Sequence, residues 1–192
     1  RQIKDFAPDV FCLTDSDSCA VDLPQLRYPA MEAVGGADAC SIPQIDGRQR
    51  IAVVFTSGST GNPLPHAKTW GGLVSSVQAE ASRLGLPHNL SCTIVGTVPP
   101  QHMYGFESTV LMAWNNGNAY SDNQPFYPAD IGQALAAVPA PRVLVSSPAH
   151  LRALLDAGLE LPEMSLVVSA TAPLSSRIAQ EIEAFCRAPL ME

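Results

Sequence analysis

The segment 56–61 concentrates hydroxyl groups and glycines at one point of the chain, directly after an apolar run rich in valine. Glycine lets the backbone approach a ligand closely, and successive amides flanked by hydroxyls form a concave set of donors for an anion. We therefore expect a phosphate-binding loop here. A plain turn between a strand and a helix would have the same composition, so this alternative stays open. The candidate residues are Thr56, Ser57, Gly58, Ser59, Thr60 and Gly61.

Three common glycine-rich motifs do not fit this segment. A P-loop that starts at Gly58 needs glycine and lysine where the chain has Pro63 and Leu64. The dinucleotide fingerprint needs glycine at Thr60, and the nucleophile elbow of hydrolases needs glycine at Ser57. An unrelated hydrolase or kinase is therefore disfavoured, and the pattern that remains is T-S-G-S-T-G-x-P.

Two later segments also place reactive or aromatic side chains directly after apolar, β-branched runs. The sequence VPPQHMYGFES covers residues 98–108, and VVSATAPLSSRIAQEI covers residues 167–182. A histidine between prolines and aromatic residues either faces a ligand or is packed within its loop. Spacing within the segment does not decide between these two interpretations.

Short apolar runs alternate with segments of helical periodicity along the chain. The runs are typical of buried strands, and apolar side chains three or four residues apart are typical of helices. Strands are predicted at 9–13, 51–57, 92–98, 142–146 and 165–170. Helices are predicted from Leu73 to the stop at Gly85, over 104–114, from Ile131 to Val138, from the cap at Ser147 and Pro148 to Gly158, and after Ser175.

This alternation predicts an α/β fold, a layered and mostly parallel sheet with helices on both faces. Ligands of such sheets bind at the carboxyl ends of the strands. We therefore expect the site to be formed by the loops 56–68, 99–105 and 169–175. Residues 1–50 are interpreted as a loop-rich lead-in with a short strand, in the same domain as the α/β core at 51–192.

The composition limits the possible functions. The 192 residues are 46% hydrophobic and 15% charged, which is typical of a globular chain, and the apolar runs are too short to span a membrane. A net charge of -7 disfavours nucleic acid as a partner. The five cysteines form no C-x-x-C pair, so we expect reduced structural thiols in the cytoplasm rather than disulfides or a metal site.

The string T-S-G-S-T-G-x-P closely resembles the phosphate loop of the adenylate-forming (AMP-dependent synthetase/ligase) superfamily, which includes the acyl-CoA synthetases. The segments 98–108 and 167–182 resemble later motifs of the same family, in the same order. The match covers the chain from about Val53 to Glu192. The resemblance implies part of the N-terminal large domain of an acyl-CoA synthetase-like protein, with both ends cut and the small C-terminal domain missing.

The resemblance also implies roles for particular residues. His102 is expected near the substrate carboxylate, with Tyr104 and Gly105 shaping the acyl pocket. Family members carry lysine where this chain has Leu64, and the nearest cation is Lys68. Lys68 either reaches back to the phosphates or the site works without that charge, so the candidate catalytic residues are His102 and Lys68. The loop expected beside the adenine and the acyl group comprises Ser169, Ala170, Thr171, Ala172 and Pro173, two of which replace the usual glycines.

The implied activity is that of an ATP-dependent ligase, which activates a carboxylic acid as an acyl-adenylate for transfer to a thiol. The thiol belongs to coenzyme A or to the phosphopantetheine of an acyl carrier protein, and ATP and Mg²⁺ are the implied cofactors. His102 would place the carboxylate rather than act as a base, because the acid is already ionised at neutral pH. A non-catalytic nucleotide- or acyl-binding module with the same fold is the alternative, and we expect the fragment alone to be inactive.

Overall fold

The computed structural model describes residues 9–14, 20–28, 43–56, 64–86 and 91–192. The chain divides into two compact units, Arg1–Gln44 and Ile45–Glu192. In the first unit, strands β1 (Cys12–Thr14) and β2 (Gln25–Arg27) pair in parallel. The strand predicted at 9–13 therefore begins three residues later than expected. That residues 1–50 belong to the same domain as the core stays a prediction.

The second unit contains a five-stranded sheet in which every pair of neighbouring strands is parallel. The strand order is β6-β5-β7-β8-β9, and the three longer strands lie in the middle. Parallel neighbours require crossover connections, which the helices between the strands supply. The α/β fold with a mostly parallel sheet is thereby confirmed. The bounds are β5 Thr93–Gly96, β6 Ala119–Tyr120, β7 Arg142–Ser146, β8 Leu166–Ser169 and β9 Leu190–Met191.

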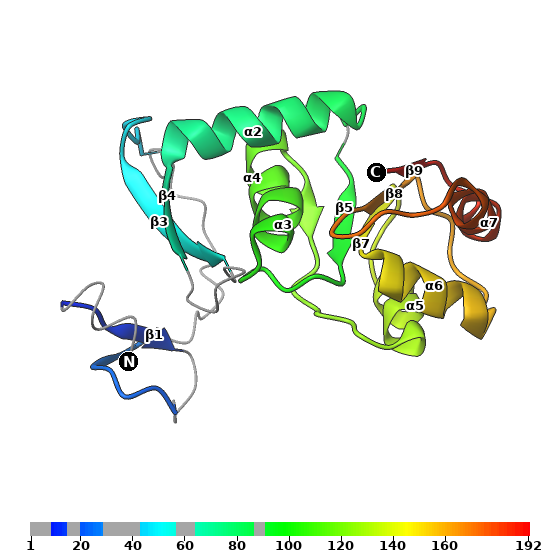
Figure 1. Cartoon of the computed structure of the whole chain (residues 1–192), viewed down its shortest axis with the longest axis horizontal. Helices are drawn as coiled ribbons and strands as arrows, with labels where there is room; N and C mark the ends of the chain where they lie inside the picture. Colours follow the sequence, from blue (N-terminus) through cyan, green and yellow to red (C-terminus); the bar gives the residue numbers. More distant parts are fainter. Residues whose placement is uncertain (1–8, 15–19, 29–42, 57–63, 87–90) are drawn as a thin grey trace, which may run out of the picture. The chain divides into compact units, whose positions relative to one another are not determined.

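Helices cover both faces of this sheet, as Figure 1 shows. The central strands are buried on both sides: in β7, Val143 and Val145 join one apolar cluster, and Leu144 joins the other. Full burial of a leucine such as Leu144, which is 0% exposed, stabilises the fold by about 1.5–3 kcal/mol. On one face lie α2 (Trp70–Arg83), α3 (Met103–Gly105), η1 (Phe106–Leu111) and α4 (Met112–Asn116); on the other lie α5 (Pro128–Ala136), α6 (Pro148–Ala157) and α7 (Ser176–Cys186).

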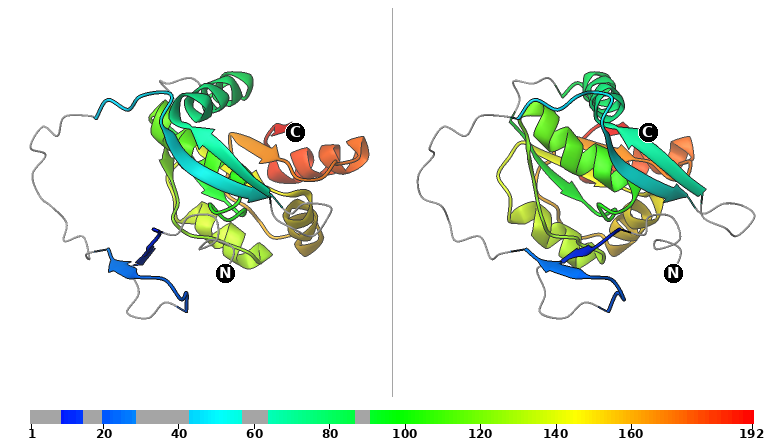
Figure 2. Two further views of the ribbon diagram at one scale, coloured as in Figure 1. Left: turned by 60° about the vertical axis from the view of Figure 1, so that its left-hand side comes forward. Right: turned by 90° about the vertical axis from the view of Figure 1, so that its left-hand side faces the viewer.

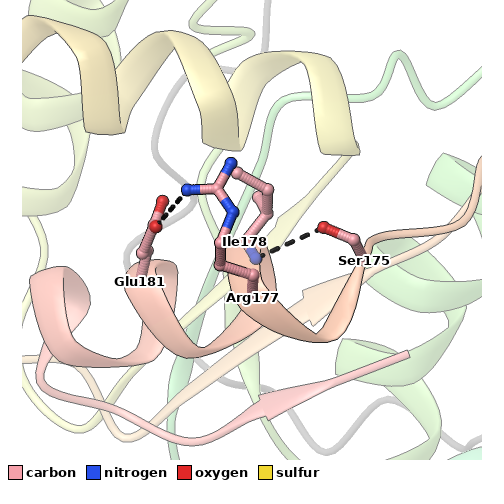
Figure 3. Close-up of polar contacts among 4 residues, drawn as sticks. All are labelled: Ser175, Arg177, Ile178 and Glu181. Atoms are coloured by element: carbon pink, nitrogen blue, oxygen red, sulfur yellow. Dashed lines mark hydrogen bonds and ion pairs between the residues drawn. The ribbon is translucent and has the colours of Figure 1, made fainter.

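The predicted helix ends are confirmed where a side chain or a glycine fixes them. Ser147 caps α6, and Gly158 ends it with φ of 59°. The Ser175 hydroxyl accepts a hydrogen bond from the Ile178 amide at 3.4 Å at the start of α7, and Figure 3 shows this contact together with the ion pair of Arg177 and Glu181. Each cap satisfies an amide that the first helical turn leaves without a partner.

The first long strand departs from the prediction. Strand β3 (Arg50–Thr56) does not join the parallel sheet but pairs with β4 (Leu64–Thr69) as an antiparallel hairpin, drawn in cyan in Figures 1 and 2. The side chains of residues 50–55 are half-buried or exposed, with Phe55 40% exposed, so the predicted strand is present but its predicted burial is wrong. The physical reason is connection length, because residues 57–63 are too few for a parallel crossover.

The hairpin also corrects the loop predicted at 56–68, because Leu64–Thr69 is a strand. The single helix predicted at 104–114 is a continuous run of α3, η1 and α4, in which η1 is a π-helix. A π-helical turn inserts an extra residue into a helix, and hydrophobic periodicity does not reveal it. The turn predicted around Gly117 is present, with φ of 68° at that residue.

Candidate functional site

The carboxyl ends of three neighbouring strands meet at one edge of the sheet. Gly96 of β5 pairs with Val145 of β7, and Ser146 of β7 pairs with Ser169 of β8. The chain segments that follow these strand ends therefore start at the same edge. We call it the carboxyl edge. Parallel sheets bind their ligands at such an edge.

Tyr104 of helix α3 is attached to this edge. Its hydroxyl lies 3.1 Å from the carbonyl oxygen of Ser146 and 3.3 Å from that of Val168, and it donates to them. Burial raises the pKa of the phenol, and the nearby charge of Glu80 raises it further. The hydroxyl therefore stays protonated and keeps donating. Tyr104 connects α3 to the ends of both β7 and β8.

Gly105 allows α3 to pack directly against the segment after β5. A Cβ atom at this position would lie 2.3 Å from the carbonyl oxygen of Pro99 and 2.6 Å from that of Val98. Both distances are far below van der Waals contact, and both atoms belong to the backbone. The close approach of Gly105 to residues 98–99 therefore leaves no room for a side chain at this position. That Gly105 shapes an acyl pocket stays a prediction.

The two candidate catalytic residues lie on different elements. His102 is the N-cap of α3, and its side chain is exposed and makes no capping hydrogen bond. Its backbone amide donates to the Pro99 carbonyl at 2.9 Å. Lys68 is half-buried on β4. Burial raises the pKa of Glu107 on η1, and the positive charge of Lys68 opposes this rise, so Lys68 lies near a carboxylate. That Lys68 reaches the phosphates stays a prediction.

The segment after β8 contains an unusual backbone conformation. Ser169 is 1% exposed, and among the described residues its hydroxyl has no hydrogen-bond partner. Ala170 donates through its amide to the Ser146 carbonyl at 3.4 Å, which ties the segment to β7. Thr171 has φ of 87°, in the region that favours glycine. Ala172 and Pro173 are exposed. A residue with a branched side chain thus adopts a conformation suited to the glycine that the family usually has here.

Replacing Thr171 with glycine is expected to relieve about 1–3 kcal/mol of strain at positive φ, which offsets or exceeds the cost of about 1 kcal/mol from the added freedom of the unfolded chain. Denaturant unfolding measures the change. Ala172→Gly is the matched control, because Ala172 is exposed and its φ is not positive; it should destabilise the protein by up to about 1 kcal/mol through the added freedom of the unfolded chain. Equal effects of the two variants would contradict strain at Thr171.

A polar cluster that the sequence analysis missed lies at the same edge. The Thr97 hydroxyl lies 2.9 Å from the Ser146 hydroxyl and 3.1 Å from Nδ1 of His150. The Ser147 hydroxyl lies 3.0 Å from the same nitrogen. Burial lowers the pKa of His150, which favours the neutral imidazole. The carboxyl-end rule, applied to the strand predicted at 142–146, would have pointed to this cluster.

Two carboxylates lie near each other between α2 and η1. Burial raises the pKa of Glu80; a hydrogen bond from the Ser108 side chain lowers it, and repulsion from Glu107 raises it. Ser108 is 3% exposed, so its hydrogen bond to Glu80 involves a buried hydroxyl. The ionised form of Glu80 is therefore disfavoured in the folded protein.

Replacing Glu80 with glutamine is expected to stabilise the protein at neutral pH but not in acid. The pKa of this carboxyl group is higher in the folded protein than its ordinary value of about 4.3 in the unfolded chain. The free energy of unfolding therefore falls as the pH rises above that ordinary value, and it stops falling once the pH exceeds the pKa of the folded protein. Glutamine keeps a hydrogen-bonding group for Ser108 without the charge. Unfolding of both proteins from about pH 4 to about pH 8 measures the difference, which should grow with pH. Exposed Glu160→Gln is the control; a difference independent of pH would contradict the assignment.

The predicted phosphate loop lies mostly outside the described residues. The backbone of Thr56 ends β3 and pairs with Leu64. In the parts of the chain that the structure describes, no group of three or more His, Cys, Asp or Glu side chains could hold a metal ion. No helix there is both long and apolar enough to cross a membrane. The residues of the loop that are not described are Ser57, Gly58, Ser59, Thr60 and Gly61.

The parallel sheet with helices on both faces defines an α/β domain. Comparison with known proteins gives the family: the sequence profile of the AMP-binding enzymes matches residues 7–192. The chain belongs to this family. The family predicted from the three sequence motifs is thereby confirmed.

The relatives found by sequence are CoA ligases. A 4-coumarate–CoA ligase of Halorhodospira halophila is 31% identical over 122 residues, which is 63% of this chain and 29% of that protein. A 4-chlorobenzoate–CoA ligase of Pseudomonas sp. (strain CBS-3) is 27% identical over 149 residues, 74% of this chain and 28% of that protein. The chain thus spans less than a third of the length of these relatives.

Solved structures share the fold. A malonyl-CoA ligase, in a ternary product complex with methylmalonyl-CoA and AMP, superposes with a TM-score of 0.79 at 19% identity over 98% of this chain and 42% of that one. An O-succinylbenzoate coenzyme A synthetase from Bacillus subtilis, in complex with ATP and magnesium ion, gives a TM-score of 0.76 at 18% identity, over 98% of this chain and 40% of that one.

Proposed function

We propose that the full-length protein is an ATP-dependent ligase that activates a carboxylic acid as an acyl-adenylate and transfers the acyl group to a thiol. The observation that carries the proposal is the family match over residues 7–192. Support comes from the CoA ligases among the relatives, which favour coenzyme A over the phosphopantetheine of a carrier protein as the acceptor. We also propose the cytoplasm as the compartment, in keeping with the buried free thiols Cys92 and Cys186.

The chemical requirement is to bring two anions together and to stabilise charge on phosphate oxygens. In the proposed reaction a carboxylate oxygen attacks the α-phosphorus of ATP, and pyrophosphate leaves. The amides and hydroxyls of residues 56–61 bind the departing phosphates. The segment 169–173 lies beside the adenine and the acyl group. His102, exposed at the start of α3, positions the substrate carboxylate, and Tyr104 and Gly105 form the wall of the acid pocket.

Mg²⁺ would supply charge neutralisation at the phosphate oxygens. The described residues contain no group of three or more acidic, histidine or cysteine side chains that could hold a metal ion, and we assign the ion to none of them. Lys68 remains the candidate cation for the phosphates, in place of the lysine that family members carry where this chain has Leu64.

Acid-dependent exchange of pyrophosphate into ATP tests the proposal. The full-length protein is incubated with ATP, labelled pyrophosphate and one acid at a time, drawn from aryl, dicarboxylic and aliphatic acids. We expect label in ATP only when a suitable acid is present, followed by a thioester when coenzyme A or a carrier protein is added. ATP binding without exchange for any acid would contradict the ligase and favour a non-catalytic binding module.

A further inference from the structure

His150 lies at the centre of a hydrogen-bonded cluster at the carboxyl edge. Its Nδ1 atom is 3.1 Å from the Thr97 hydroxyl and 3.0 Å from the Ser147 hydroxyl. The ring of Phe126 meets the imidazole edge-on, with 5.2 Å between ring centroids. Residues that follow β5, β6 and β7 therefore all contact this one imidazole. None of the roles proposed above uses it.

The cluster continues from His150 to the end of β7. The Thr97 hydroxyl is 2.9 Å from the Ser146 hydroxyl, and both residues are buried, with Ser146 0% exposed and Thr97 5% exposed. The Thr97 amide also donates to the Val145 carbonyl at 3.0 Å. Because buried hydroxyls are costly to leave unpaired, the Thr97 hydroxyl is held between the Ser146 hydroxyl and the imidazole nitrogen.

Ser146 connects this cluster to Tyr104. Its side chain bonds to Thr97, and its carbonyl oxygen accepts from the Tyr104 hydroxyl at 3.1 Å. A continuous path of hydrogen bonds thus runs from His150 through Thr97 and Ser146 to Tyr104. Within this path, the Ser146 hydroxyl and the Ser146 carbonyl are joined by the covalent bonds of that residue. The hydroxyl that bonds to Thr97 and the carbonyl that accepts from the phenol therefore belong to one residue.

We propose that His150 is a positioning residue that fixes Tyr104, through Thr97 and Ser146, as the wall of the acid pocket. The part that concerns the acid rests on the proposed function. Loss of the imidazole removes one partner from the buried Thr97 hydroxyl and one from the half-buried Ser147 hydroxyl, and we expect the rearrangement of Thr97 to reach Ser146, its other partner. The expected consequence is weaker placement of the acid and unchanged binding of ATP.

The test compares His150→Ala with His150→Asn in the full-length protein. Asparagine places a polar atom where Nδ1 stands, so it should restore the bond to Thr97. Tyrosine ring labelling with carbon-13 reports on the position of the ring without any activity, and Tyr104→Phe assigns its signal. The Tyr104 signal should move in the alanine variant and return in the asparagine variant. Tyr28 and Tyr120 serve as internal references.

The kinetic readout is the KM for the acid found by pyrophosphate exchange. It should rise about tenfold in His150→Ala, in keeping with the loss of one hydrogen bond, with the KM for ATP unchanged and with recovery in His150→Asn. If the alanine variant does not fold, Thr97→Val breaks the same path with little change of shape. An unmoved Tyr104 signal, or equal changes in both KM values, would overturn the proposal.

Failure of the proposed function gives a different result. If the wild-type protein exchanges no pyrophosphate with any acid, both the ligase activity and the role of Tyr104 in an acid pocket are contradicted. The ring signal of Tyr104 then still decides whether His150 positions this side chain.

Discussion

Gly105→Ala is expected to destabilise the protein by about 3 kcal/mol, the upper end of the usual penalty for forcing an extra carbon into a packed site. The added Cβ would lie 2.3 Å from the Pro99 carbonyl oxygen and 2.6 Å from that of Val98. Neither oxygen can move without shifting the backbone that leads from β5 to α3. Equilibrium unfolding in denaturant measures the change, and a displaced α3 should also raise the KM for the acid.

Gly132→Ala is the matched control for this prediction. Gly132 also lies in a helix, α5, but an added Cβ would meet only the Leu161 side chain at an ordinary 3.5 Å. Alanine is the better helix former, so this variant should keep or gain stability by up to about 1 kcal/mol. If both variants unfolded at the same denaturant concentration as the wild type, the close packing of α3 on residues 98–99 would be wrong.

Simultaneous replacement of Ser59 and Thr60 with alanine is expected to slow pyrophosphate exchange by about a hundredfold, the usual loss when a donor to a developing charge is removed. Both hydroxyls belong to the predicted phosphate loop. The effect should appear mainly in the rate at saturating ATP, because these donors act on charge that grows as pyrophosphate departs. Folding should be unaffected.

Ser75→Ala controls for the loss of a hydroxyl elsewhere in the sequence, because Ser75 is exposed on α2. It should exchange pyrophosphate at the wild-type rate. A double variant within a few-fold of this control would show that the segment 56–61 is a plain turn, the alternative that its composition left open.

Local sequence signals predicted the elements that depend on local interactions. The strand 142–146 has the bounds Arg142–Ser146, and the helix between the cap at Ser147 and the stop at Gly158 is α6. Periodicity did not predict the strands β6 (Ala119–Tyr120) and β9 (Leu190–Met191), because two residues cannot show a period, and only the family resemblance indicated a strand at the second. Their strand conformation comes from pairing with longer neighbours.

The residues of the candidate site also divide into those that a local motif predicts and those that depend on contacts distant in sequence. Tyr104 and Gly105 were found through a recognisable motif, and the structure places both at the carboxyl edge. The hydrogen bond between Thr97 and His150 joins residues 53 positions apart, so no local sequence pattern predicts it. The hairpin was missed for the opposite reason: the apolar run at 51–57 fits both a buried strand and a hairpin strand, and only the short connection at 57–63 distinguishes them.

The fate of the carboxylate oxygen tests the central claim most directly. The acid identified by exchange is labelled with oxygen-18 in its carboxylate and converted to a thioester by the full-length protein and ATP. If the carboxylate attacks the α-phosphorus, one labelled oxygen must remain on the AMP released when the thiol displaces it. We predict label in AMP and none in pyrophosphate. Label in inorganic phosphate with formation of ADP, or AMP without label, would contradict the account.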